Sequence, residues 1–334
     1  MWAVENQTPY AAERTWVRDR DGAHHWIVVV KATFDIANDG TLTLADEQPE
    51  PLHAPEYWGE PGLSSVRYEA DLVAAKPGTD VIVNANAHAP KGKPARSVDV
   101  ALRIGGLTKS LVVHGTRVYT SGISGLGTSK AVPFTSKPIS YEWAYGGTDT
   151  EDPDTSKQLI DMRNPVGKGV TKRSARLVNT PAHSVEYPNG NPAKAGPAGF
   201  GAIASYWLPR LKLAGTYDAK WVESRKPLLP ADYDERFVLC APADQRLPQH
   251  LRGGEKVALL NMTPEGLLSF ELPTTGFTFA THFATRRESH EGKLVSVTID
   301  AEEKRLMMTW QASLLVKAPE ADYLDITVIE EVAS

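Results

Sequence analysis

The chain has 334 residues, of which 41% are hydrophobic, so it is long enough for one large domain or two medium ones with a buried core. Its 36 Lys and Arg residues against 41 Asp and Glu residues give a formal net charge of −5, and no long block of like charges is present. Proteins that bind nucleic acid or anionic membranes present a basic surface. The charge balance therefore argues against both as main partners.

The chain contains a single cysteine, Cys240, so no disulfide can form within it. This fits a reducing compartment. Residues 1–5 have no basic stretch and no long apolar run, so we expect no signal peptide. The longest apolar stretch, residues 26–30, is far too short for a membrane helix. We therefore expect the protein to work in the cytoplasm.

The first third of the chain shows alternating hydrophobic patterns. In residues 25–36 the apolar side chains stand at the even positions from Trp26 to Ile36, which predicts a strand with one buried face. A turn at residues 38–40 lets residues 41–44 return as a second arm. Residues 97–104 alternate in the same way, and Gly105 and Gly106 turn the chain into a partner strand. Residues 81–88 form a further predicted strand.

The middle of the chain, residues 121–249, is rich in Pro and Gly, and the alternation fades. We interpret it as long loops laid over the sheets, with one or two short helices. Its many aromatic residues argue against disorder, because disordered segments are poor in aromatics.

The last third is predicted to be β again. Candidate strands are residues 257–260, 267–272, 277–283, 294–299, 304–310 and 323–329. The predicted fold class is mainly β. Two β-rich parts, residues 1–120 and 250–334, are joined by the loop-rich middle at 121–249. The two parts are sandwich-like or barrel-like, and local patterns leave open whether they form one continuous domain.

Motifs for chemistry are weak in this sequence. Residues 122–130 come near a phosphate-binding loop, but Thr128 stands where the motif needs Lys. The same stretch nearly forms a nucleophile elbow at Ser124, with Leu126 in place of the second Gly. His24 and His25 would point to opposite faces of a strand, and Cys240 lies in an apolar run. We therefore predict no catalytic residue, no metal site and no cofactor.

Acidic residues leave an alternative open. Asp232 and Asp234 lie beside Arg236, and residues 149–154 form another acidic stretch. A hydrolase with a loop-borne acidic site remains one alternative, although solvated loops with local ion pairs explain both clusters.

Aromatic residues beside Gly and charged groups point to protein recognition, because binding residues concentrate on loops held by a rigid scaffold. The opposite interpretation is that these aromatics fasten the loops to the sheets. The predicted partner-binding residues are Tyr141, Trp143, Tyr145, Arg163, Asn164, Phe200, Tyr206 and Trp207.

A set of short motifs, in order along residues 8–272, resembles the bacterial domain-of-unknown-function family 2169. The motifs are Thr8-Pro9-Tyr10, Ala12-Glu13-Arg14, Val30-Lys31-Ala32-Thr33-Phe34, Glu56-Tyr57-Trp58-Gly59-Glu60, Tyr68-Glu69-Ala70-Asp71-Leu72, Lys76-Pro77-Gly78-Thr79-Asp80, residues 141–147, Arg163-Asn164-Pro165-Val166-Gly167, residues 197–201, Gly215-Thr216-Tyr217-Asp218, Leu229-Pro230 with Asp232-Tyr233-Asp234, and residues 251–255. The match is poorer at residues 173–187.

The resemblance implies a role and no catalytic activity. Members of this family sit beside effectors of the bacterial type VI secretion system. The implied protein is a non-enzymatic adaptor or chaperone that binds a cognate effector and helps load it onto the spike protein. A permanent structural or immunity partner is a further alternative.

Overall fold

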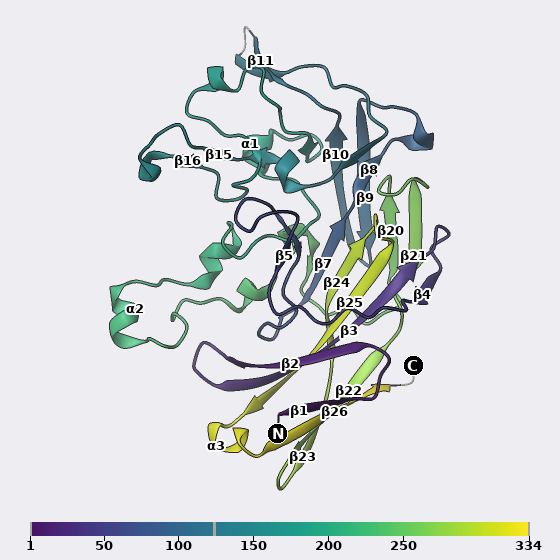
Figure 1. The fold of residues 1–334 in the computed structure, drawn as a ribbon, viewed down its shortest axis with the longest axis vertical. Helices are drawn as coiled ribbons and strands as arrows, with labels where there is room; N and C mark the ends of the chain where they lie inside the picture. The colour runs from purple at the N-terminus through teal and green to yellow at the C-terminus, as the bar shows by residue number, and fades with distance from the viewer. Residues whose placement is uncertain (1, 123–124, 333–334) are drawn as a thin grey trace.

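The computed structural model describes residues 2–122 and 125–332. Three main sheets and five small two-stranded ladders account for most of the regular structure of these residues, and the helices are short (Figure 1). The predicted mainly-β class is confirmed.

A seven-stranded sheet runs through the centre of the molecule. Its strands, in spatial order, are β19 (Arg246–Leu247), β7 (Thr79–Asn84), β24 (Lys293–Asp300), β25 (Arg305–Val316), β3 (His24–Ile36) and β2 (Ala11–Arg18), and β4 (Leu42–Leu44) also pairs with β3. The β3–β4 hairpin was expected from the turn at residues 38–40, and β24 and β25 were both among the candidate strands. Strand β24 lies parallel to β7, which places a late strand beside an early one.

A five-stranded sheet lies above it in Figure 1. Its order is β18 (Val185–Glu186), β10 (Leu107–His114), β9 (Ser97–Ile104), β20 (Lys256–Leu260) and β21 (Leu267–Glu271). The predicted turn at Gly105 and Gly106 joins β9 to β10, and the apolar positions of β9 are buried as expected.

A four-stranded sheet packs against the lower part of the central sheet. Its order is β1 (Ala3–Asn6), β26 (Leu324–Val332), β22 (Gly276–Phe283) and β23 (Arg287–Glu291). The indole N–H of Trp26 on β3 donates to the hydroxyl of Thr327 on β26 at 2.9 Å. The rings of Phe277 and Trp310 meet edge to face, with centroids 5.0 Å apart. Aromatic side chains therefore join these two sheets.

The remaining elements are short. The two-stranded ladders are β5 (Glu56–Tyr57) with β6 (Val66–Tyr68), β8 (Asn86–His88) with β13 (Ser136–Pro138), β11 (Tyr119–Gly122) with β12 (Gly125–Thr128), β14 (Tyr145–Gly146) with β17 (Lys168–Gly169), and β15 (Thr148–Asp149) with β16 (Leu159–Ile160). The α-helices are α1 (Pro192–Ala195), α2 (Ala219–Ser224) and α3 (Ala318–Ala321). The 3₁₀ turns are Pro90–Gly92, Tyr141–Trp143, Thr155–Lys157, Ser174–Arg176, Arg210–Ala214, Glu235–Val238 and Ala243–Gln245.

The prediction of one buried face was wrong for strand β3. Its alternation indicated a single buried face, but both faces are buried along its centre. Loops cover the second face and supply partners for its polar groups. Lys31 forms an ion pair with Asp71, and the backbone of Thr33 exchanges hydrogen bonds with the Gln48 side chain. Polar residues can therefore occupy a buried face here without an unpaired charge.

The two ends of the chain contribute to the same sheets and to one core. A single cluster of buried hydrophobic residues includes members of β3, β9, β20, β22 and β26. The loop-rich middle lies mostly to the left of these sheets in Figure 1. In the described part of the chain, no helix has the length and hydropathy required of a membrane span.

Candidate partner-binding site

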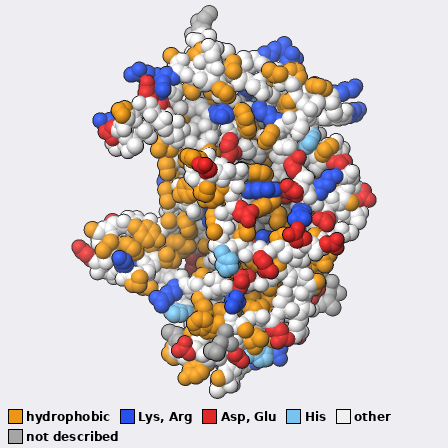
Figure 2. Space-filling model, in the orientation of Figure 1, with side chains coloured by type: hydrophobic (Ala, Val, Ile, Leu, Met, Phe, Trp, Pro, Cys, Tyr) orange, Lys and Arg blue, Asp and Glu red, His pale blue; other side chains and the backbone are white. Residues whose placement is uncertain are grey.

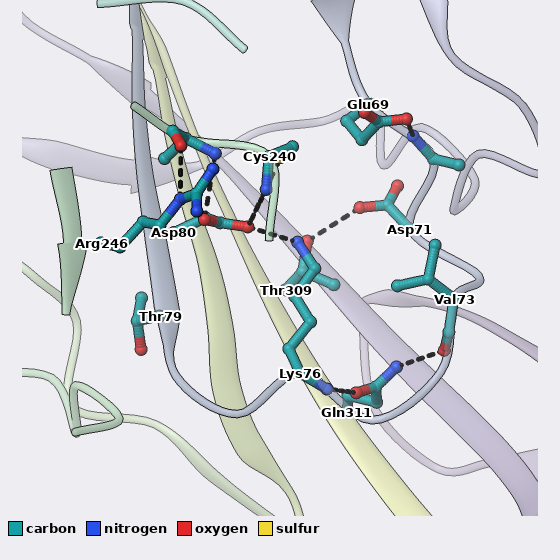
Figure 3. A network of polar contacts seen from close by, with 12 residues as sticks. Glu69, Asp71, Val73, Lys76, Thr79, Asp80, Cys240, Arg246, Thr309 and Gln311 are labelled. Carbon is teal, nitrogen blue, oxygen red and sulfur yellow. Dashed lines mark hydrogen bonds and ion pairs between the residues drawn. The ribbon is translucent and has the colours of Figure 1, made fainter. Parts of the chain in front are cut away.

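Buried charges fasten the loops to the central sheet (Figure 3). The Lys76 ammonium lies 2.9 Å from a carboxylate oxygen of Asp80 on β7, and both side chains are buried. Asp80 also accepts hydrogen bonds from the backbone N–H groups of Cys240 and Ala241, at 2.9 and 3.0 Å. Burial alone would lower the pKa of Lys76, but the Asp80 carboxylate raises it above its usual value. Both groups therefore stay ionised and hold the segment around residue 240 in place.

Two further ion pairs continue this network. Asp71 binds Lys31 on β3 at 2.9 Å, and Glu69 pairs with Arg210. A cavity of about 20 Å³ lies among the network side chains, which is close to the space that one water molecule needs. The network has no room for a substrate, so its chemistry serves loop attachment.

Cys240 belongs to the same network. Its thiol is fully buried and lies 3.4 Å from Asp80. Burial, and then the negative charge of Asp80, raise the pKa of the thiol well above its usual value. Nucleophilic cysteines need a lowered pKa and access to solvent, so this thiol has neither property.

Lys109 fastens the loops to the five-stranded sheet. It extends from β10, and its ammonium donates to the carbonyl oxygen of Gly199, to Asp244 and to Gln245, at 2.6, 2.8 and 2.7 Å. These three acceptors match the three N–H groups of a lysine. Burial lowers the pKa of Lys109 to about 8 despite the favourable charge of Asp244.

Four of the eight predicted partner-binding residues lie in the interior. These are Tyr141, Asn164, Phe200 and Trp207, each at most 3% exposed. The rings of Tyr141 and Trp207 meet edge to face at 5.6 Å, and the Asn164 amide donates to the Tyr141 carbonyl oxygen at 2.8 Å. In this structure they attach the loops to the core, so they are not on a surface that a partner can touch.

The other four predicted residues are partly exposed but do not form one cluster. Arg163 makes a bidentate pair with Asp161, Tyr145 packs against His183, and Tyr206 packs against Trp207. Only Trp143 among them lines the groove described next.

A groove of about 490 Å³ opens beside Trp143. It lies between the β5–β6 loop, the 3₁₀ turn at Tyr141–Trp143, the β8–β13 ladder and the turn between β24 and β25. Most of its surface is apolar. Its lining residues are Trp58, Gly59, Ser64, Arg67, Ala85, Asn86, Pro138, Ile139, Ser140, Glu142, Trp143, Asp300, Glu302 and Glu303.

Trp58 forms one wall and is 48% exposed, which is high for a tryptophan. The guanidinium of Arg67 lies over its ring at 4.7 Å from the centroid. The same guanidinium binds Asp300 at 3.1 Å and Glu303 at 3.2 Å. The two carboxylates thus hold Arg67 in place, and its guanidinium in turn packs on the exposed indole of Trp58.

Trp143 also lines the groove, and two lysines lie beside its ring. The ammonium groups of Lys137 and Lys168 lie 4.8 and 4.7 Å from its ring centroid. Glu142, the preceding residue, accepts hydrogen bonds from the backbone N–H and the hydroxyl of Ser65 through one carboxylate oxygen. The other oxygen, Oε2, is buried and has no hydrogen-bond partner among the described residues.

Sequence reasoning missed Trp58 and Arg67 as site residues. The available signal was a tryptophan next to Gly59 within a loop-like motif, because a large aromatic residue on an exposed loop is typical of a binding surface. What the motif could not show is which distant segments form the rest of the groove.

The acidic clusters considered for a hydrolase are engaged in local structure. Asp232 accepts from the backbone and hydroxyl of Thr216, and Asp234 caps the turn Glu235–Val238 and pairs with Arg236. Asp149 accepts from Thr171, Lys172 and Arg176.

No group of three or more His, Cys, Asp or Glu residues in the described ranges is placed to hold a metal ion. Within the near-match to a phosphate loop, Gly122 and residues 125–128 belong to the β11–β12 ladder, and Ser124 lies outside the described residues.

A lobe carrying α2 stands out from the body, and Figure 2 shows hydrophobic side chains over much of its visible surface. Leu211, Tyr217 and Val222 are exposed there. Within the lobe, Asp232 accepts a hydrogen bond from the hydroxyl of Thr216. The lobe also contacts the β2–β3 turn, because the Arg225 guanidinium donates to the Arg20 carbonyl oxygen. It is a second exposed apolar surface, distinct from the groove.

Comparison with known proteins gives one match. No curated protein and no solved structure matches the chain significantly. A family model described as an uncharacterized protein conserved in bacteria (DUF2169) matches residues 21–311, which is most of the chain. The chain therefore belongs to the bacterial DUF2169 family.

Proposed function

We propose that this protein is a non-enzymatic adaptor that binds a cognate type VI secretion effector in the bacterial cytoplasm and helps load it onto the spike protein. The observation that carries the proposal is the apolar groove between Trp58 and Trp143 on a scaffold whose loops are fastened by buried charges. Exposed tryptophan and arginine side chains in a concave site are typical of protein-binding hot spots.

The state of the ionisable groups supports binding over catalysis. A general acid or base needs a reachable group with a suitable pKa, and a nucleophile needs a base beside it. In the clusters described above, the carboxylates cap turns or neutralise a neighbouring cation, and the thiol of Cys240 is buried. These groups stabilise the protein and leave its exposed apolar surface to bind a partner.

The groove is too small to form the whole interface with an effector. A stable protein complex buries about 800 Å² on each partner, which is more than one groove of this size provides. The exposed apolar side chains of the α2 lobe offer further contact area. We propose that the groove supplies the central anchor of the interface and that surrounding surface completes it.

The proposal is tested by co-purification from the native bacterium. The tagged protein is expressed with and without the effector encoded beside it, and the spike protein is followed in the same eluate. We expect the effector to co-purify, and to lose solubility or secretion when this gene is deleted. An effector that is secreted normally without the gene would refute the adaptor role. A complex that stays intact on the assembled, secreted tip would instead indicate a permanent structural partner.

A further inference from the structure

We propose that the Trp58–Trp143 groove binds an extended segment of the partner that presents an arginine or lysine side chain between apolar residues. The inference rests on the proposed function in one respect, namely that the occupant is a protein. It goes further in naming the chemistry of the segment, which follows from the charges and the apolar walls of the groove.

The lining residues of the groove carry more negative than positive charge. Among the lining residues, the four carboxylates of Glu142, Asp300, Glu302 and Glu303 outnumber one cationic side chain, that of Arg67. The ammonium groups of Lys137 and Lys168 lie beside the lining, against the ring of Trp143. Asp300 and Glu303 already bind the Arg67 guanidinium. In the described ranges, Glu142 and Glu302 have no Arg or Lys cation paired with them, and Glu302 is exposed, so the groove favours a cation and disfavours phosphate groups or an acidic peptide.

Glu142 contributes a fixed negative charge beside the groove. One of its oxygens is engaged by Ser65, whereas Oε2 is buried without a donor in the part of the chain that the structure describes. A buried acceptor without a partner costs about 1–3 kcal/mol, and more when it is charged. Because Oε2 has almost no accessible surface, a cation in the groove interacts with the charge of this carboxylate rather than through a hydrogen bond to Oε2.

Glu302 is a second unneutralised carboxylate among the lining residues. Its carboxylate accepts from the backbone N–H of Asn86 and lies 3.2 Å from a ring nitrogen of His88. Its side chain is 42% exposed, so one edge of the carboxylate stays open to solvent. A cation in the groove can therefore contact Glu302 directly.

The apolar walls define the rest of the segment. Trp58, Ile139, Pro138 and Trp143 line the groove beside the carboxylates. Aliphatic and aromatic side chains on both sides of the cation would cover these surfaces, and the aliphatic stem of arginine or lysine is itself suited to lie along an indole. A cationic side chain within an apolar segment therefore matches both features of the lining.

The test uses the full-length protein and two synthetic peptides. One peptide carries a single arginine between leucines, and the other has glutamate in place of the arginine. Binding is followed by NMR through the indole N–H signals of Trp58 and Trp143, which are assigned by Trp58→Phe and Trp143→Phe. We expect the arginine peptide to shift both signals in a saturable manner that weakens with added salt. Equal shifts with the glutamate peptide, or no shift with either, would overturn the inference.

Two matched variants test whether the charge of Glu302 contributes to binding of the arginine peptide. Glu302→Gln keeps the shape of the side chain and removes its charge, and we expect binding of the arginine peptide to weaken about threefold to fivefold. Glu330→Gln changes an exposed glutamate on β26, far from the lining residues, and should bind like the wild type. Equal binding by both variants would contradict the role of Glu302.

The outcomes separate this inference from the adaptor role. If the effector co-purifies with the wild-type protein but the arginine peptide does not bind, the adaptor role stands and the inference about the segment fails. If the arginine peptide binds selectively but no effector co-purifies, the groove chemistry is supported and the adaptor role fails.

Discussion

Lys76 and Asp80 show how single residues of a family motif act in the fold. Removing one partner of a buried ion pair leaves the other charge uncompensated, which costs about 3–5 kcal/mol. We therefore expect Lys76→Met to lower the free energy of unfolding by about that amount in urea titrations. Lys194→Met, at an exposed lysine on α1, is the control and should stay within about 0.5 kcal/mol of the wild type.

A double variant separates the ion pair from other effects of the Lys76 substitution. Lys76→Met combined with Asp80→Asn removes both charges, so it should be more stable than Lys76→Met alone. If Lys76→Met unfolds at the same urea concentration as the control, the network does not hold the loops as described.

Lys137 predicts a dependence of stability on pH. Its buried ammonium donates to the Ser184 hydroxyl at 2.7 Å and forms no ion pair with any carboxylate among the described residues. Burial, and then the charges of Arg117 and Lys168, lower its pKa in the folded protein to about 8. The unfolded chain, with a pKa near 10.5, binds more protons between these values, so stability rises as the pH increases from about 8 to about 10.5.

The measurement compares the wild type with Lys137→Met, because other titrating groups are shared and cancel. The difference in unfolding free energy, wild type minus variant, should increase by about 2 kcal/mol between about pH 7 and pH 9.5. A difference that stays constant over this range would show that Lys137 titrates normally.

At the scale of single residues, the sequence predicted that the aromatic residues are ordered, but it did not predict which of them are buried. The aromatics of the middle segment were recognised as ordered, but a tryptophan at position 207 and one at position 143 look alike in a linear pattern. Their burial depends on which distant segments cover them. Trp207 is covered by Tyr141 and Tyr206, whereas Trp143 borders the groove.

At the scale of elements, the close approach of β7 to β19 depends on Gly78. A Cβ at this position would lie 2.2 Å from the carbonyl oxygen of Leu247. Gly78→Ala should therefore push the two segments apart and destabilise the protein by about 1–3 kcal/mol. Gly106→Ala is the matched control, because a Cβ there meets no atom within 4 Å. Thermal unfolding of both variants checks the prediction, and equal midpoints would contradict it.

Strands with strict alternation were predictable, and others were not. β9 and β10 keep one face in the core and one in solvent, so their pattern shows in the sequence. β2 was missed because it is an edge strand whose side chains are mostly half-buried on both faces. β26 was among the candidate strands, but one of its partners, β1, comes from the opposite end of the chain, and no local pattern predicts that pairing.

At the scale of the whole molecule, the sheets interleave strands from both ends of the chain, and the groove is formed by segments far apart in sequence. Trp58, Trp143 and Glu302 converge only because the central sheet brings their loops together. A sequence pattern can indicate that a loop is suited to recognition, but the shape and charge of a composite site follow from topology. This is why the groove and its acidic lining became visible only in the structure.

The most direct test of the central claim is the affinity of the neighbouring effector for Trp58→Ala, measured beside the wild type and beside Tyr323→Ala, an exposed aromatic outside the groove. Equal melting temperatures for the three proteins confirm that they are folded. Truncation of a central anchor costs about 2 kcal/mol or more, so Trp58→Ala should bind at least about 30-fold more weakly while Tyr323→Ala binds normally. Unchanged affinity of Trp58→Ala for the effector would contradict the claim that this groove anchors the partner.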